Sequence, residues 1–285
     1  MRTALYGAAP AMSTPAAVSI PSLTGWALVL GASSGFGEAV SSYLARAGCH
    51  IIGVHLDRRA TMGNVERIQH EITAFGREAW FFNINAADET KRREVCDEIA
   101  RRFKERGKNE SLRVVLHSLA FGSLKPFVGE TIEDELNQKQ IEMTSDVMAH
   151  SLVYWVQDLM HRKLIGPEGR IFAMTSTGSW AVWKGYGAVS SAKAALEAHV
   201  RQLACELGPR GITANAICAG VTDTPALRKI PDNDAMVQVA LRKNPSHRLT
   251  RPEDVAAAII ALAQPCAYWI NGNVINVDGG EAAAG

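Results

Sequence analysis

The chain has 285 residues, of which 47% are hydrophobic and 21% are charged, a composition typical of a globular protein that buries a full core. Its net charge of +1 gives no electrostatic reason to expect a nucleic acid or an anionic membrane as a partner. No apolar run approaches the roughly 20 residues that a transmembrane helix needs, so we expect no membrane span.

Residues 1–24 are rich in alanine, proline and serine and contain no acidic residue. They have neither helical nor strand periodicity, and Arg2 is their only charged residue. A transit peptide usually carries more arginine on an amphipathic pattern. We therefore predict a flexible leader over residues 1–24 and one folded domain over residues 25–285.

From Gly25 onward, short β-branched or aromatic runs alternate with longer amphipathic stretches. The runs predict seven strands, at residues 26–31, 50–55, 79–84, 113–118, 170–175, 212–218 and 273–277. The stretches between them, such as 37–48 and 88–107, have the apolar spacing of helices that join parallel strands in right-handed crossovers. The predicted fold class is α/β, a single Rossmann-like, doubly wound, seven-stranded parallel sheet with helices on both faces.

A glycine-rich turn, GASSGFG at residues 31–37, follows the first predicted strand and precedes a helix. Gly31, Gly35 and Gly37 allow a tight turn and a close approach of the backbone to a pyrophosphate at the helix N-terminus. In a doubly wound sheet, ligands bind beyond the carboxyl ends of the strands. The turn therefore predicts a dinucleotide site, although a glycine-rich turn without a ligand is the alternative.

Together with Lys193 in the second half of the chain and NVDGG at the last strand, this turn resembles the short-chain dehydrogenase/reductase superfamily over residues 25–280. The resemblance implies a nicotinamide dinucleotide, hydride transfer, and a homo-oligomer, either a dimer or a tetramer. It also implies cofactor contacts, which are Gly31, Ser33, Gly35, Phe36 and Gly37 at the phosphates, Asn85 and Ala86 at the adenine, Leu119 and Lys193 at the nicotinamide ribose, Val221 and Thr222 at the carboxamide, and Thr224 at the pyrophosphate.

The choice between NADH and NADPH depends on the end of the second strand. An acidic residue there usually binds the adenine ribose hydroxyl of NAD, whereas arginine accommodates the phosphate of NADP. His55 occupies the expected acid position, and Asp57, Arg58 and Arg59 follow it. We favour NADPH, with Arg58 as a phosphate ligand, and keep NADH as the alternative because Ser34 is not basic.

Three departures from the usual superfamily pattern resemble the enoyl-acyl carrier protein reductases. HSLAF stands at residues 117–121 where most members have N-N-A-G, and Ser145 lies near the position of a catalytic asparagine. Tyr186 precedes Lys193 by seven residues instead of four. Ser176 stands where much of the branch has a second tyrosine, ten residues before the first, so the subtype is left open.

The position of Tyr186 fits the chemistry of enoyl reduction. An enoyl reductase delivers hydride to Cβ, so negative charge develops on the thioester oxygen, further from the nicotinamide than in a ketoreductase. Helix positions seven apart share a face, which would keep the tyrosine directed into the cleft. We predict that Tyr186, Lys193 and Ser176 are catalytic, and that the Lys193 ammonium makes Tyr186 more acidic.

The substrate is expected to be an enoyl thioester, possibly carried by acyl carrier protein. Phe121, Ser176 and Tyr186 are its predicted contacts, and Trp180 and Trp183 are candidate walls of an apolar slot. A lid is predicted over about residues 222–247, with Leu227, Ile230, Met236 and Val237 facing inward. Its basic residues either attract an acidic carrier or form a solvated face, and they are Arg228, Lys229, Arg242 and Lys243.

Two rival functions stay open. The near rival is a 3-oxoacyl thioester reductase, or another carbonyl reductase or alcohol dehydrogenase, because Ser176 occupies the serine position of those enzymes. The distant rival is a dinucleotide-binding sensor without catalysis. The eight histidines have no metal-ligand spacing, and His117 is expected to be structural. The five cysteines lack a C-x-x-C pair, which favours a reducing, cytoplasmic location without a zinc site.

Overall fold

The computed structural model describes residues 20–107 and 110–284. Seven strands form one parallel sheet in the order β3-β2-β1-β4-β5-β6-β7. Their bounds are β1 Trp26–Leu30, β2 His50–His55, β3 Ala79–Asn83, β4 Leu112–His117, β5 Ile165–Ser176, β6 Thr213–Ala219 and β7 Val274–Val277. The predicted doubly wound, seven-stranded sheet is therefore confirmed.

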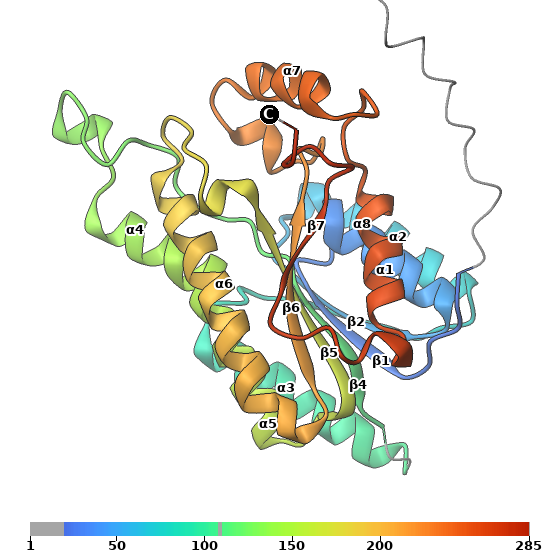
Figure 1. Cartoon of the computed structure of the whole chain (residues 1–285). Coiled ribbons are helices and arrows are strands. Elements are labelled where there is room, and N and C mark those ends of the chain that lie inside the picture. The colour runs from blue at the N-terminus through green and yellow to red at the C-terminus, as the bar shows by residue number, and fades with distance from the viewer. Residues whose placement is uncertain (1–19, 108–109, 285) are drawn as a thin grey trace, which may run out of the picture.

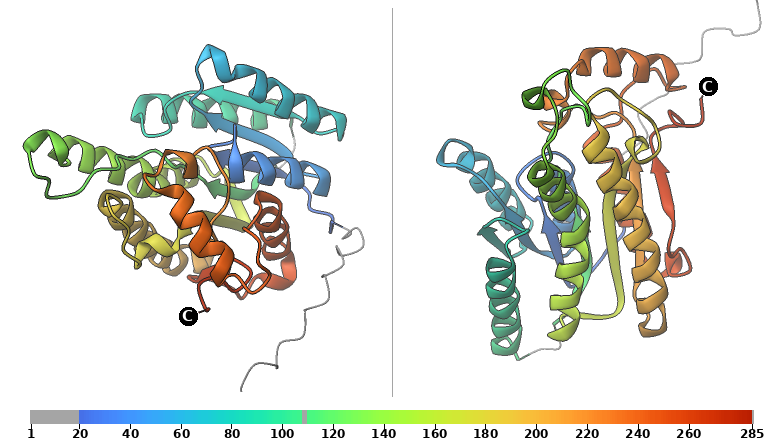
Figure 2. Two further views of the ribbon diagram at one scale, coloured as in Figure 1. Left: turned by 90° about the horizontal axis from the view of Figure 1, so that it is seen from above. Right: turned by 90° about the vertical axis from the view of Figure 1, so that its left-hand side faces the viewer.

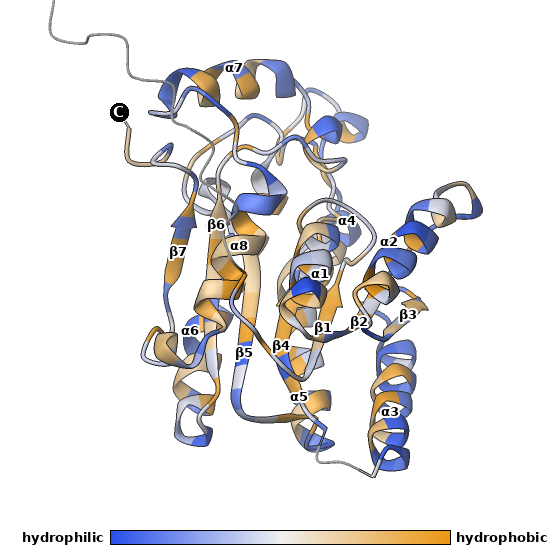
Figure 3. Cartoon of the chain, turned by 90° about the vertical axis from the view of Figure 1, so that its right-hand side faces the viewer, coloured by the Kyte–Doolittle hydropathy of each residue, from blue (hydrophilic) through white to orange (hydrophobic). Residues whose placement is uncertain are grey.

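Helices cover both faces of the sheet (Figures 1 and 2). One apolar core joins the sheet to α1 (Gly35–Ala47), α2 (Met62–Ala74) and α8 (Pro252–Leu262). The other joins it to α3 (Glu89–Glu105), α5 (Ser151–His161) and α6 (Gly187–Leu207). Figure 3 shows hydrophobic strands between helices of mixed hydropathy, as expected when a sheet is buried on both faces.

The order of the strands fixes where a ligand can bind. The chain proceeds outward from β1 to β3 on one side and from β4 to β7 on the other, so β1 and β4 are neighbours at the switch point. The loops after these two strands must diverge, which opens a crevice at the carboxyl edge of the sheet. The glycine-rich turn after β1 and the segment after His117 in β4 both lie at this edge.

Two further helices lie close to this edge. The short helix α4 (Gln138–Ser145) continues through a π-helical turn at Asp146–His150 into α5. Ser145 is the last residue of α4, so it precedes the π-helical turn, a feature common at functional sites. The predicted lid contains a 3₁₀ turn at Leu227–Lys229 and α7 (Asn233–Lys243), which lies above the carboxyl ends of the strands in Figure 1.

The folded part of the chain begins before Gly25. Leu23 is only 4% exposed, and its N–H donates to the carbonyl oxygen of Ala47 at the end of α1. The Leu23 carbonyl oxygen lies 2.8 Å from the position of a Cβ on Gly48. Leu23 thus packs against the folded domain, and residues 1–19 of the predicted leader lie outside the described residues. None of the helices in residues 20–107 and 110–284 is long and apolar enough to cross a membrane.

Candidate active site

The glycine-rich turn forms a cradle that side chains would fill. Gly31 has a φ of +88°, and a Cβ there would lie 2.4 Å from the Ser118 carbonyl oxygen. A Cβ on Gly37 would lie 2.0 Å from the Gly31 carbonyl oxygen. No side chain of Gly31 or Gly37 therefore covers the backbone where α1 begins. The unpaired N–H groups of the first turn of a helix favour an anion. The turn fits a dinucleotide pyrophosphate.

Residues from distant loops meet at this turn. A Cβ on Gly35 would contact the side chain of Thr224 at 3.4 Å, and a Cβ on Gly31 would contact Leu119 at 3.5 Å. Phe36 lines the central cavity together with Thr224. Predicted cofactor residues from the loops after β1, β4 and β6 are thus brought together, since parallel strands present their carboxyl ends at one edge.

The end of β2 places a carboxylate beside the same turn. His55 is buried, and its Nδ1 atom lies 3.0 Å from Oδ2 of Asp57. Burial by itself raises the pKa of Asp57, but hydrogen bonds from Ser33, Thr61 and His55 together lower it below its usual value. Asp57 is therefore an ionised carboxylate next to Ser33, where it can accept a hydrogen bond from a ribose hydroxyl.

The predicted phosphate ligand and the predicted adenine contacts lie around this carboxylate. Arg58 and Arg59 are both exposed. Asn85, after β3, is also exposed, and its side-chain oxygen accepts the N–H of Ala87. Ala86 is buried, and its carbonyl oxygen accepts the indole N–H of Trp155 at 2.8 Å, so only its N–H and Cβ are left for an adenine.

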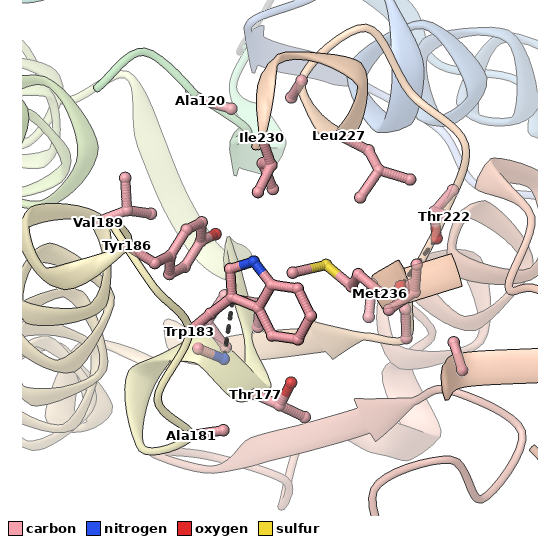
Figure 4. A pocket seen from close by; sticks show the side chains of 18 of the residues that line it. Ala120, Thr177, Ala181, Trp183, Tyr186, Val189, Thr222, Leu227, Ile230 and Met236 are labelled. Atoms are coloured by element: carbon pink, nitrogen blue, oxygen red, sulfur yellow. Dashed lines mark hydrogen bonds between the residues drawn. The ribbon is translucent and has the colours of Figure 1, made fainter. Parts of the chain in front are cut away.

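A cavity of about 420 Å³ extends from Phe36 to the start of α6. Ser176, Tyr186 and Val189 line its inner wall, and Thr222 lies on the side of the cofactor residues. Figure 4 shows Tyr186 and Trp183 pointing into the cavity, opposite the side chains of the lid. The predicted catalytic hydroxyls and the predicted cofactor residues therefore share one space.

Tyr186 is the residue immediately before α6, so it lies at the end of the helix and not on its face. Its carbonyl oxygen accepts the N–H of Ser190 at 2.8 Å, which continues the helical direction by one residue. A Cβ on Gly178 would lie 2.6 Å from the Tyr186 ring and 3.1 Å from Oγ of Ser176. Gly178 thus lets the phenol and the serine hydroxyl approach each other.

The acidity of Tyr186 differs from the prediction. Burial raises its pKa above the usual value, and only the hydrogen bond with Ser176 acts in the opposite direction. The expectation of a more acidic phenol was wrong, because the cost of desolvating the phenolate has a larger effect on the pKa than any neighbouring group. Tyr186 therefore keeps its proton at neutral pH and can donate it.

Lys193 is buried on α6, 6% exposed, and its Nζ donates to the carbonyl oxygen of Met174 in β5 at 2.6 Å. Burial lowers its pKa to about 8, although the nearby Glu197 carboxylate raises it. An ammonium has three donors, so one bond to Met174 leaves two for other acceptors. This position suits the predicted role at a ribose.

His117 lies at the end of β4 and is completely buried. Its Nε2 atom lies 2.9 Å from Oγ of Ser151, and Nδ1 has no hydrogen-bond partner within the described chain. Burial, together with the smaller effect of the Lys193 charge, lowers its pKa to about 3. A permanently neutral histidine beside a lysine agrees with the structural role expected for it.

The wall facing the lid agrees in part with the prediction. Trp180, Trp183, Leu227, Ile230 and Met236 line the cavity. Val237 is half-buried but is not among the described lining residues, and Val239 and Ala240 take its place because α7 begins only at Asn233. The indole N–H of Trp183 donates to the Pro231 carbonyl oxygen at 3.4 Å, which joins the wall to the lid.

Phe121, a predicted substrate contact, is not among the described residues that line the cavity. Its side chain is 58% exposed, and the cavity is lined instead by its neighbours Ala120 and Gly122. Periodicity cannot set which way a side chain points in a loop, so this direction was not predictable. The sequence analysis also missed Met148, Gly178 and Glu281. Only Glu281 had a local signal, a charge directly after NVDGG.

Within residues 20–107 and 110–284, no group of three or more His, Cys, Asp or Glu residues could hold a metal ion. A doubly wound sheet with a glycine cradle, a tyrosine in the adjoining cavity and a buried lysine on the helix that follows this tyrosine is typical of a nicotinamide-dependent oxidoreductase.

A family model described as Enoyl-(Acyl carrier protein) reductase matches residues 31–281. The chain therefore belongs to this family within the short-chain dehydrogenase/reductase superfamily, whose members use a nicotinamide cofactor.

Curated relatives are similar over different shares of the chain. An NADPH-dependent aldehyde reductase-like protein, chloroplastic, of Arabidopsis thaliana is 27% identical over 94% of this chain and 99% of its own length. An enoyl-[acyl-carrier-protein] reductase [NADH] of Aquifex aeolicus is 31% identical, over 60% of this chain and 62% of its own.

Solved structures agree on the fold. A short-chain dehydrogenase of Burkholderia cenocepacia in complex with NADP has 26% identity and a TM-score of 0.75, and the match covers 90% of this chain and 98% of that one. The enoyl-[acyl-carrier-protein] reductase (NADH) of Aquifex aeolicus has 22% identity and a TM-score of 0.79, with 93% and 98% covered. At this identity the second likeness shows the fold alone.

Proposed function

We propose that this protein reduces the 2,3 double bond of an enoyl thioester with a nicotinamide cofactor. The observation that carries the proposal is the Tyr186 hydroxyl, which enters an apolar cavity beside Ser176 from a position seven residues before Lys193. A donor displaced in this way suits the oxygen of a carbonyl carbon that lies two bonds from Cβ, the carbon that receives the hydride.

The roles of the residues follow from their protonation and position. A reduced nicotinamide, when bound, would supply the hydride to Cβ. Tyr186 is protonated because burial raises its pKa, so it can donate a hydrogen bond and then its proton to the thioester oxygen of the resulting enolate. Tautomerisation of this enol moves the proton to Cα, and solvent reprotonates Tyr186. Ser176 orients the phenol, since its hydroxyl hydrogen-bonds to Tyr186. Lys193 holds the nicotinamide ribose with its buried ammonium.

The remaining walls suit an apolar acyl chain. Met148, Trp183, Leu227, Ile230 and Met236 contribute carbon and sulfur surface around the cavity. Burial of each additional methylene group of a substrate there is worth about 0.8 kcal/mol. Tyr186 and Ser176 supply polar groups at the inner end, which suits a thioester head with an apolar tail.

The proposal also includes a carrier protein as the partner, a homo-oligomer and a cytoplasmic location. Lys229 and Lys243 line the cavity, whereas Arg228 is paired with Asp223, at 2.8 Å from Nε to Oδ1, so a carrier protein would meet fewer free basic groups than expected. A homo-oligomer is supported by exposed apolar side chains at and near β7, which are Tyr268, Trp269 and Val274. A cytoplasmic location stays a prediction.

The enoyl substrate is tested against the near rival with one pair of compounds. We expect crotonyl thioester to be reduced and acetoacetyl thioester not to be, as followed by the loss of nicotinamide absorbance with NADH and with NADPH. The competing carbonyl reductase is favoured by Ser176 and by the full-length likeness to an aldehyde reductase-like protein. Faster turnover of acetoacetyl thioester would establish the rival and mean that the tyrosine spacing was over-interpreted.

Cofactor preference is tested at the end of β2. We propose that NADPH binds more tightly than NADH because Arg58 and Arg59 are exposed and can pair with a ribose phosphate. Replacing both with alanine should remove most of the preference in a fluorescence titration, and Asp57→Asn should increase it by removing a like charge. If the unmodified protein prefers NADH, Asp57 is the ribose ligand and the arginine argument is wrong.

A further inference from the structure

The chain after β7 turns back beneath the lid (Figure 1). Asp278 is buried, and its carboxylate accepts the N–H groups of Gly280 and Ala282, each at 2.9 Å. Asn244, directly after α7, donates its side-chain amide to the Asp278 carbonyl oxygen at 2.8 Å. The turn formed in this way places Glu281 and Ala282 among the residues that line the cavity.

The Glu281 carboxylate takes a backbone donor that the cofactor would need. The N–H of Val221 donates to both carboxylate oxygens, at 3.3 and 3.2 Å. The Val221 carbonyl oxygen accepts the N–H of Thr250 at 3.2 Å. Val221 is the residue expected at the nicotinamide carboxamide, and both its N–H and its carbonyl oxygen are therefore already hydrogen-bonded. The N–H is bound by the side chain of Glu281, which can rotate away.

The surroundings keep this carboxylate close to Val221 without binding it firmly. A Cβ on Gly220 would lie 2.9 Å from Oε2 of Glu281, so only glycine allows the close approach. Burial raises the pKa of Glu281, the Val221 N–H lowers it, Asp278 raises it and Lys243 lowers it. The contact is shared between two oxygens at long distances, which is weak for a charge-assisted bond.

We propose that Glu281 competes with the cofactor for the Val221 N–H and thereby lowers the affinity of the nicotinamide half of the dinucleotide. The proposal rests on the expected contact of Val221 with the carboxamide and not on the identity of the substrate. When Glu281 yields the N–H, the turn at residues 278–282 loses one anchor. Because Asn244 holds this turn to the lid, cofactor binding also loosens the attachment of α7.

Titration with two ligands separates this role from a structural one. ADP-ribose carries the adenosine and pyrophosphate of NADH but has no nicotinamide, so Glu281 should not affect its binding. We expect Glu281→Ala to lower the Kd for NADH by about tenfold, the equivalent of 1.4 kcal/mol, and to leave the Kd for ADP-ribose unchanged. Glu281→Gln keeps an acceptor without the charge and should give a smaller gain.

The control variant is Glu206→Gln, which changes an exposed glutamate at the end of α6 and should alter neither Kd. Equal changes of both Kd values in Glu281→Ala, or weaker binding of NADH, would overturn the proposal and make Glu281 a structural anchor. No acyl substrate is used, so failure here is distinct from failure of the proposed enoyl reduction.

Hydrogen exchange in the unmodified protein provides a measurement that does not depend on a variant. NADH should increase amide exchange in residues 278–284, whereas ADP-ribose should not, because only the nicotinamide half displaces Glu281. Increased protection of this segment with NADH, or an equal response to both ligands, would contradict the displacement.

Discussion

Tyr186→Phe is expected to lower turnover by about 10² to 10⁴ while the fold and the cofactor affinity stay unchanged, which is the usual effect of removing a positioned acid or oxyanion donor. Phenylalanine keeps the ring that packs against Gly178 and removes only the hydroxyl that enters the cavity. The measurement is kcat on the accepted thioester, with cofactor Kd and thermal unfolding as the checks on integrity.

Ser176→Ala separates an assisting hydroxyl from a full member of the site. If Ser176 only orients the phenol, its loss should cost less than the loss of Tyr186, and the pKa of Tyr186 should rise further because one stabilising hydrogen bond is gone. Equal losses would make both hydroxyls essential.

Full activity of Tyr186→Phe on every accepted substrate would refute the mechanism and leave the tyrosine as part of the cavity wall.

Val189→Tyr, combined with Tyr186→Phe, restores the usual spacing of four residues before Lys193. We expect no rescue, since the new hydroxyl would lie one helical turn away from the position of Tyr186. Val189 is also only 5% exposed, and its Cγ2 atom lies 3.1 Å from the position of a Cβ on Gly122. A tyrosine would therefore overpack this wall.

Lys193→Met should weaken cofactor binding as well as turnover, which distinguishes it from Tyr186→Phe. Methionine retains the apolar stem and removes the ammonium donors, so the cavity left by Lys193→Ala is avoided. A hydrogen bond from a charged group is worth about 1.5–3 kcal/mol, so the Kd should rise by about 10- to 100-fold. An unchanged cofactor Kd would exclude Lys193 as the ribose ligand.

The pH dependence of the same lysine provides a second readout. Its pKa in the folded protein is about 8, against 10.5 for a lysine exposed to solvent. The ammonium form exists below pH 8, so cofactor affinity should fall as the pH rises through about 8, and Lys193→Met should lack this step. The free energy of unfolding should instead rise as the pH increases from 8 to 10.5. In this range Lys193 binds more protons in the unfolded chain than in the folded protein.

Local patterns in the sequence were sufficient for the architecture. Each strand is a short apolar run with β-branched or aromatic residues, and α3 over Glu89–Glu105 follows the three-and-four spacing seen between residues 88 and 107. Alternation of the two element types then leaves a parallel sheet as the arrangement that buries both kinds of apolar face. The glycine cradle was also predictable, since Gly31 and Gly37 stand where any Cβ would collide with backbone.

The chemistry of the cavity depended on distances that no local pattern contains. The Phe121 side chain turned outward, and α7 presented Val239 instead of Val237. Burial raised the pKa of Tyr186 although Lys193 lies on α6, the helix that begins directly after this tyrosine. Spacing fixes which residues share a helical face, but direction in loops and loss of solvent follow from packing between elements.

Sequence by itself thus determined the order of the elements, the cradle at residues 31–37 and the seven-residue spacing between Tyr186 and Lys193, because these depend on neighbours along the chain. Tertiary structure alone decided that the Glu281 carboxylate reaches the N–H of Val221, a residue 60 positions earlier. The two meet because β6 and β7 pair in parallel and end at the same edge of the sheet.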